Sequence, residues 1–180
     1  MKLKLRLNIN IMNTPITNHY TDILKNEAVV FNPGEGEVLA IENSRITLKV
    51  TSELSNNKMG IYEIVLGPGT VGAQLHYHRF MDETFIVNKG TLTIQLSDKM
   101  IDAVEGSVVY IPRFTPHGFR NTTDQDVTAT LIFNPGQSRE GFFFGLKEIL
   151  TEQPINPAKF LKLYEKYDSI PVNAENMLPG

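Results

Sequence analysis

The chain contains no cysteine among its 180 residues. This absence excludes disulfide bonds, thiolate metal sites and a cysteine nucleophile, so any bound metal ion must be held by nitrogen and oxygen ligands. Histidine is also scarce, because the whole chain has four, and three of them fall in the segments described below. The candidate metal ligands are therefore few.

An excess of positive charge is absent as well. The chain has 17 Lys and Arg against 20 Asp and Glu, which gives a net charge of -3 and a pI near 5.8. No run of basic residues follows the chain, and this argues against a nucleic-acid partner. No stretch approaches the roughly 20 apolar residues of a membrane span. We therefore expect a cytoplasmic protein with neither nucleic acid nor membrane as a partner.

The start of the chain lacks the features of a secretion signal. Its basic first residues are followed by residues 8–13, which are too polar for the apolar region of such a signal. We interpret residues 1–36 as an N-terminal extension that ends in a Pro-Gly turn, and Met12 as an alternative initiator.

Residues 37–135 have the pattern of an all-β domain. Short apolar or alternating runs are separated by turn residues such as Gly67-Pro68-Gly69 and Asn134-Pro135-Gly136. The runs that predict strands are 38–41, 45–51, 60–66, 91–96, 107–111 and 128–133. Strands at this spacing are typical of a sandwich or a barrel.

After residue 135 the apolar periodicity becomes helical. Residues 141–150 have apolar side chains at helical spacing, and Asn156-Pro157 has the pattern of a helix start. We predict one or two helices in a C-terminal tail, residues 136–180, packed on the barrel. The aromatic stripe of the second helix is expected to pack on the barrel rather than to bind a partner or substrate.

His76 and His78 lie two residues apart in a strand pattern. Residues i and i+2 of a strand point to the same face about 6 to 7 Å apart, so one ion can bridge both imidazoles. Glu83 begins the next apolar run, and a hairpin there would place its carboxylate beside them. His117 follows a rigid, proline-containing segment, and its strand can neighbour that of the first pair in an antiparallel barrel.

Three imidazoles and one carboxylate form a nitrogen-rich ligand set. Such a set suits one divalent ion of Fe, Ni, Mn, Co, Cu or Zn better than Ca or Mg. Four protein ligands leave one or two coordination positions open, as a catalytic metal requires. Each of these residues alone has an ordinary structural explanation, and the joint pattern is what indicates a metal site.

Two segments resemble the two motifs of the cupin family. The residues with matching spacing in the first segment, 72–90, are His76, His78, Glu83 and Gly90. Those in the second segment, 106–121, are Gly106, Pro112, His117 and Asn121. The sequence departs from the family at Phe114, where a glycine is usual, and at Thr70, where the leading glycine of the first motif falls.

The resemblance implies a double-stranded β-helix, the jelly-roll barrel of cupins, over residues 37–135. It also implies a metal ion held by His76, His78, Glu83 and His117, and frequently a homodimer. The layout is similar to the monodomain, quercetinase-like branch (cupin type 2), which implies an oxidoreductase of the dioxygenase type.

Residues on the same strand faces as the ligands are candidate walls of a substrate pocket. These are Gln74, Phe85 and Phe119, although the two phenylalanines are equally compatible with plain core filling. The favoured function is a dioxygenase acting on a small phenolic or enolisable carbonyl compound, with Glu83 as both ligand and proton acceptor. The alternatives are a metal-assisted isomerase or lyase of a sugar or keto acid, and a non-catalytic small-molecule-binding module.

Overall fold

Two antiparallel sheets organise the part of the chain that the computed structural model describes, residues 27–152 and 154–173. The strands are β1 (Glu37–Ile41), β2 (Ser44–Val50), β3 (Gly60–Leu66), β4 (Val71–Tyr77), β5 (Asp82–Lys89), β6 (Thr91–Leu96), β7 (Met100–Val104), β8 (Val108–Ile111), β9 (His117–Arg120), β10 (Val127–Asn134) and β11 (Ile170–Pro171). The helices are α1 (Ser52–Ser55), α2 (Glu140–Thr151) and α3 (Pro157–Lys166).

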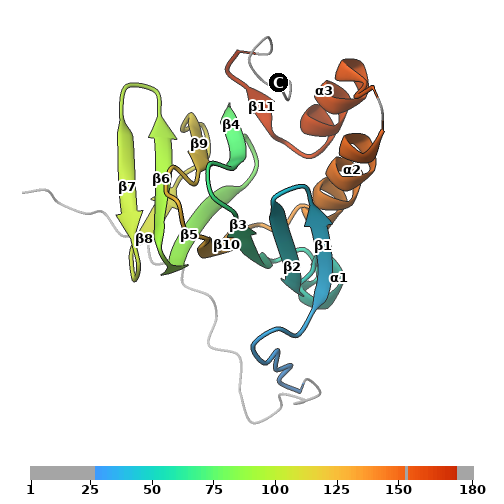
Figure 1. Ribbon diagram of the computed structural model, residues 1–180. Helices are drawn as coiled ribbons and strands as arrows, with labels where there is room; N and C mark the ends of the chain where they lie inside the picture. The colour runs from blue at the N-terminus through green and yellow to red at the C-terminus, as the bar shows by residue number, and fades with distance from the viewer. Residues whose placement is uncertain (1–26, 153, 174–180) are drawn as a thin grey trace, which may run out of the picture. The chain divides into compact units, whose positions relative to one another are not determined.

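The six-stranded sheet has the order β1-β2-β3-β10-β5-β8, and the five-stranded sheet has the order β11-β4-β9-β6-β7 (Figure 1). Strands that follow one another along the chain therefore often lie in different sheets, as in a jelly roll. The predicted all-β fold with C-terminal helices is confirmed. Of the predicted N-terminal extension, residues 1–26 and the alternative initiator Met12 lie outside the described residues, and residues 27–36 contain no helix or strand.

The core lies between the sheets because the central strands alternate strictly between buried and partly exposed positions. In β10 every second residue is buried, and Leu131 lies opposite Tyr62 of β3 and Phe85 of β5. Burying side chains of this size stabilises the fold by about 1.5 to 3 kcal/mol each. Period-two patterning predicted β3, whereas β10 was predicted as an apolar run. The edge strand β7 escaped prediction because only Ala103 of its residues is buried.

The C-terminal tail is attached to the barrel at two points. Both carboxylate oxygens of Glu140, at the start of α2, accept hydrogen bonds, from the Tyr62 hydroxyl at 2.8 Å and from Ser52 at 3.1 and 3.2 Å. Helix α3 begins as predicted, since the Asn156 side chain accepts from two backbone amides and Pro157 follows. The second attachment is β11, which was not predicted and which pairs with β4 (Figure 1).

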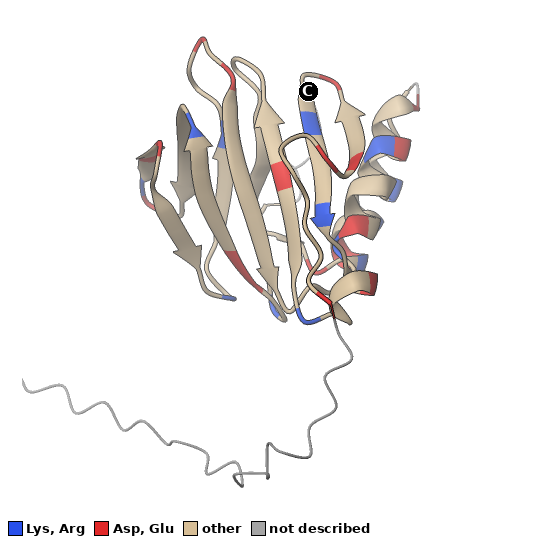
Figure 2. Ribbon diagram, turned by 90° about the horizontal axis from the view of Figure 1, so that it is seen from below, with Lys and Arg blue, Asp and Glu red and all other residues tan. Residues whose placement is uncertain are grey.

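Charged side chains are few along the strands, and the C-terminal helices carry both signs (Figure 2). Among the described residues no helix combines the length and the hydropathy that crossing a membrane would require.

Phe114, which stands where the family usually has glycine, has a φ of +65° and a mostly exposed side chain. Its backbone N–H donates to the His78 carbonyl at 2.7 Å, so this left-handed residue holds the loop before β9 against the end of β4. A side chain in this region strains the backbone. The family pattern and the backbone conformation therefore agree, although the residue type does not.

Replacing Phe114 with glycine should raise the free energy of unfolding by about 0.5 to 1 kcal/mol, because the strain relieved exceeds the extra entropy of glycine in the unfolded chain. Denaturant titration measures the change. Phe144→Gly, at an exposed position within α2, is the matched control and should lower stability by about 1 kcal/mol. A loss of stability in Phe114→Gly would show that its ring makes contacts that matter more than the strain.

Candidate metal centre

Three histidines meet at the end of one strand pair. β4 and β9 are antiparallel neighbours in which His76 lies directly opposite His117, and His78 follows just after β4. A Cβ at Gly118 would lie 2.7 Å from the Ala73 carbonyl oxygen, so glycine is what lets β9 approach β4 this closely. The prediction that the strand of His117 is adjacent to the strand of His76 is confirmed.

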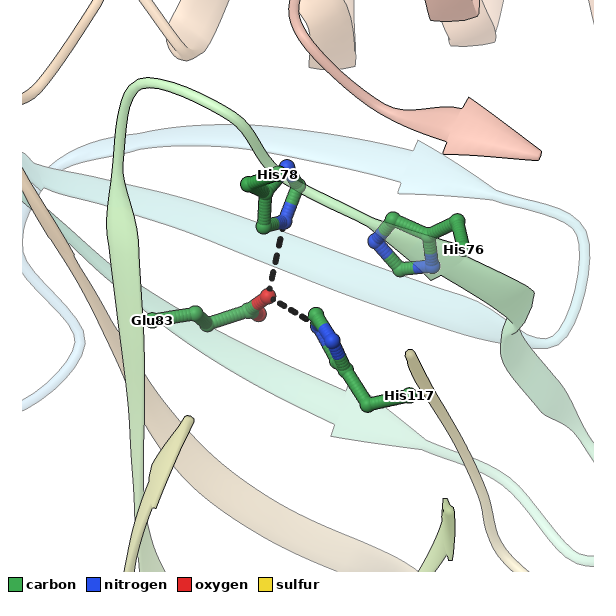
Figure 3. Close-up of side chains that lie close together, drawn as sticks. All are labelled: His76, His78, Glu83 and His117. Carbon is green, nitrogen blue, oxygen red and sulfur yellow. Dashed lines mark hydrogen bonds and ion pairs between the residues drawn. The ribbon is translucent and has the colours of Figure 1, made fainter. Parts of the chain in front are cut away.

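Glu83 reaches the histidines from the other sheet. The predicted hairpin is wrong: between His78 and Asp82 the chain crosses from the five-stranded to the six-stranded sheet, because β4 and β5 belong to different sheets. Glu83 therefore faces the imidazoles across the barrel interior, with its Oε2 3.1 Å from His78 Nε2 and 2.9 Å from His117 Nε2 (Figure 3). The one ligand atom that each of the four residues offers lies within 4.8 Å of all the others.

Backbone carbonyls orient all three imidazole rings. His76 Nδ1 lies 2.8 Å from the Gln74 carbonyl oxygen, and His117 Nδ1 lies 2.9 Å from that of Thr115. His78 Nδ1 contacts the carbonyl of Asp168. A carbonyl oxygen only accepts, so each Nδ1 carries hydrogen and each Nε2 faces the centre of the cluster, where it could bind a metal ion.

The donor set fits a divalent transition-metal ion. All four side chains are buried, and His76 Nε2 has no hydrogen-bond partner among the described residues. An orphaned nitrogen in a dry interior is costly, and a cation at the centre would satisfy it. The close contacts of Glu83 Oε2 with two Nε2 atoms need protons between them in the metal-free protein, and an ion replaces those protons.

The electrostatics favour the charge states that a metal needs. Burial lowers the pKa of His76 well below its ordinary value, and the neighbouring imidazoles of His117 and His78 lower it further, so this imidazole is neutral. Burial alone would raise the pKa of Glu83. Hydrogen bonds from His117 and His78 outweigh that effect and bring the pKa below its usual range, so the carboxylate is ionised.

Asp168 belongs to the site although no sequence pattern pointed to it. Its carbonyl fixes His78, 90 residues earlier in the chain, and its Oδ2 accepts the backbone N–H groups of Arg79 and Phe80 at 2.9 and 2.7 Å. It adopts a φ of +57° between α3 and β11. The C-terminal tail thus positions a metal ligand, and so distant a contact leaves no mark on local periodicity.

A cavity of about 480 Å³ opens onto the centre, with His76 and Glu83 among its lining residues. This volume suits a small-molecule ligand. Of the predicted pocket residues, Gln74 and Phe119 line the cavity. Phe85 is not among the lining residues: its fully buried ring packs on Phe119, with 5.1 Å between centroids.

The C-terminal helices form much of the cavity wall. The lining residues from this part of the chain are Arg139, Phe142, Phe143, Leu146, Leu150, Phe160 and Tyr164. Part of the predicted aromatic stripe therefore faces the cavity, and sequence reasoning did not single out Arg139. Helical spacing alone cannot tell a side chain that fills a core from one that lines a hollow in it.

Comparisons with known proteins agree with the two-sheet fold. A family model described as a cupin domain matches residues 62–133. No curated protein matches the chain. KdgF from a Halomonas species is similar in structure, with a TM-score of 0.56 and 16% identity, over 63% of this chain and 99% of that one.

Two further solved structures are similar to this chain. One is a predicted oxalate decarboxylase from Thermotoga maritima, with a TM-score of 0.52 and 18% identity over 60% of this chain and 99% of that one. The other is the polyketide cyclase RemF from Streptomyces resistomycificus, with a TM-score of 0.52 and 15% identity over 60% of this chain and 80% of that one. At these identities the likeness shows the fold alone.

His76→Ala should lower the metal content of the purified protein sharply, because it removes one of four ligands from a buried site. Elemental analysis by ICP mass spectrometry measures metal per chain. The matched control is His19→Ala, since His19 is the remaining histidine of the sequence and should leave the metal content unchanged. Full occupancy in His76→Ala would contradict the assignment of this ligand.

Asp168→Ala should weaken metal binding about 10-fold, because partners that orient a ligand imidazole contribute that much to affinity. The substitution removes the carboxylate that binds the backbone amides of Arg79 and Phe80. Alanine also disfavours the left-handed backbone that directs the residue 168 carbonyl to His78. Asp168→Asn keeps a hydrogen-bond acceptor and tolerates the left-handed backbone, so its metal affinity should lie between those of wild type and Asp168→Ala. Competition with a chelator measures affinity, and equal affinity in wild type and Asp168→Ala would show that the tail does not position His78.

Proposed function

Because this chain belongs to the cupin superfamily, we propose that it is a metal-dependent oxidoreductase of the dioxygenase type, acting on a small phenolic or enolisable carbonyl compound. One observation carries the proposal: a buried cluster of three histidines and one glutamate borders a largely apolar, aromatic-lined cavity, which His76 and Glu83 line directly. The ion would be one of Fe, Ni, Mn, Co, Cu or Zn, held by His76, His78, Glu83 and His117. When bound, it supplies a Lewis-acidic centre with open coordination positions.

The protein's own groups would prepare the substrate. Glu83 is ionised and lines the cavity, so its carboxylate can accept a proton from a substrate hydroxyl or enolisable carbon. Gln74 lines the same cavity and offers an amide to orient a polar substituent. The aromatic walls exclude water and provide flat surfaces for a planar ring.

Tyr164 adds a hydrogen-bond donor beside the centre. Burial raises the pKa of its phenol to about 12 against the opposing charge of Arg139, so the hydroxyl keeps its proton at neutral pH. Its ring lies 6.4 Å from the His76 ring, centroid to centroid, and lines the cavity. We assign Tyr164 the role of a donor to a substrate oxygen.

A second candidate function is a metal-assisted isomerase or lyase, since the same ligand set supports Lewis-acid chemistry without oxygen. The largely apolar, aromatic lining favours a planar compound over a sugar and so places the keto acid first within this class. A non-catalytic binding protein would give a stoichiometric complex without turnover. The homodimer and the cytoplasmic location stay predictions.

Glu83→Gln should reduce substrate-dependent oxygen uptake by about 100-fold or more, because an amide cannot accept the substrate proton. The measurement is a screen of phenolic and enolisable compounds with an oxygen electrode, with metal content determined on the same samples. Glu63→Gln, on the outward-facing side of β3, is the matched control and should keep full activity. Unchanged turnover in Glu83→Gln would rule out its role as base. Product formation without oxygen uptake would favour the isomerase or lyase.

A further inference from the structure

Arg139 is a buried cation in the wall of the metal cavity. It precedes α2, its side chain is 4% exposed, and it lines the cavity together with His76 and Glu83. Its guanidinium carbon lies 4.0 Å from the centroid of the Phe142 ring and 4.8 Å from that of Phe133. The guanidinium therefore lies over these rings, and a ligand in the cavity would have to bind its N–H groups rather than its faces.

The hydrogen bonds of Arg139 leave it without a paired carboxylate. Nη1 donates to the Tyr167 carbonyl at 3.0 Å and to Ser169 Oγ at 2.8 Å, both of them neutral acceptors. Nε is buried and has no partner in the described part of the chain. Burial lowers the pKa of Arg139, yet a guanidinium stays charged at neutral pH. A fully buried arginine is normally paired with an anion, so the protein side of this pairing is incomplete.

The charge balance of the loaded site points the same way. Glu83 is committed to the metal centre, and the Asp168 carboxylate accepts from the backbone amides of Arg79 and Phe80 and lies 3.9 Å from Arg79 Nε. A divalent ion and Arg139 together exceed these two carboxylates by one positive charge, since the ligand imidazoles are neutral. In a cavity walled by apolar rings this excess is poorly screened, and an anionic ligand would neutralise it.

We propose that Arg139 binds a carboxylate group of the ligand while another oxygen of the same ligand faces the metal centre, so that the substrate class is small, planar, acidic phenols or enolisable acids. The N–H groups at the edge of a guanidinium match the two oxygens of a carboxylate in one plane. This inference rests on the proposed metal site and narrows its substrate class.

A path of aromatic side chains joins the two ends of this binding mode. The Tyr164 ring lies 6.4 Å from that of His76 and 5.0 Å from that of Phe142, and Phe142 stacks on the Arg139 guanidinium. A flat ligand whose ring packs along this wall can present one polar end to the metal and the opposite end to Arg139.

The test compares 4-hydroxybenzoate with its methyl ester, a pair that differs in charge at one end. In 4-hydroxybenzoate the hydroxyl and the carboxylate lie at opposite ends of the ring and cannot chelate one ion. Calorimetric titration of anaerobic, metal-loaded protein should show that wild type binds the acid about 10-fold to 100-fold more tightly than the ester. Arg139→Gln should abolish this preference, and Arg139→Lys should keep part of it.

Arg120→Gln is the matched control, because Arg120 is half-buried and hydrogen-bonded to Gln95 but does not line the cavity. It should keep the preference for the acid. The wild-type comparison needs no variant, so the inference can fail even if Arg139→Gln does not fold. Equal affinity for acid and ester, undetectable binding of the acid, or a preference that survives in Arg139→Gln would each overturn it. Metal content measured on the same samples separates the two failures, because wild type without metal would contradict the proposed function itself.

Discussion

Four ionisable side chains lie buried between two sheets, and the rest of the structure depends on pairing their charges and satisfying their hydrogen bonds. An isolated charge in such a place is strongly disfavoured unless it is paired or coordinated. Here backbone carbonyls take up every Nδ1 hydrogen, Glu83 supplies one negative charge, and His76 Nε2 is left without a partner among the described residues. Because backbone carbonyls beside β4 and β9 hold the Nδ1 atoms of His76 and His117, the geometry of these two rings is tied to the register of that strand pair, whereas His78 also depends on Asp168 of the C-terminal tail.

The C-terminal tail completes a site that the barrel alone leaves unfinished. The family match ends at residue 133, yet the carbonyl that orients His78, the arginine in the cavity and much of the aromatic wall come from residues 139–168. The tail is attached through Glu140 and through the pairing of β11 with β4. A change in how α2 or α3 packs would therefore reach both the cavity and a metal ligand.

The sequence carried those parts of the structure that depend on local periodicity or fixed spacing. Alternating and apolar runs predicted most of the strands, and the spacing of His76, His78, Glu83 and His117 predicted the cluster. The failures are contacts that local patterns do not encode. The hairpin at Glu83 was wrong because the chain changes sheets there, β7 is too exposed to show alternation, and Asp168 acts on His78 from 90 residues away. Phe85 lies two residues after Glu83, and Phe119 lies two residues after His117, so strand alternation treats them alike. Only the packing shows that Phe119 lines the cavity while Phe85 lies behind it.

The cluster of histidines and Glu83 belongs to the barrel, whereas much of the cavity wall belongs to the C-terminal tail, so the two can vary separately. The four metal-facing side chains come from β4, β5, β9 and the residue after β4, which are held by ladder hydrogen bonds and a shared core. Phe160 and Tyr164 come from α3 and Arg139 directly precedes α2, and all three line the cavity. Substitutions on the inner helix faces can therefore alter the charge and shape of the cavity while the ligand geometry stays intact. Asp168 is the exception, because its carbonyl contacts the His78 imidazole directly. A substitution that moves this part of the tail would therefore change both the small molecules that the cavity accepts and the affinity for a metal ion.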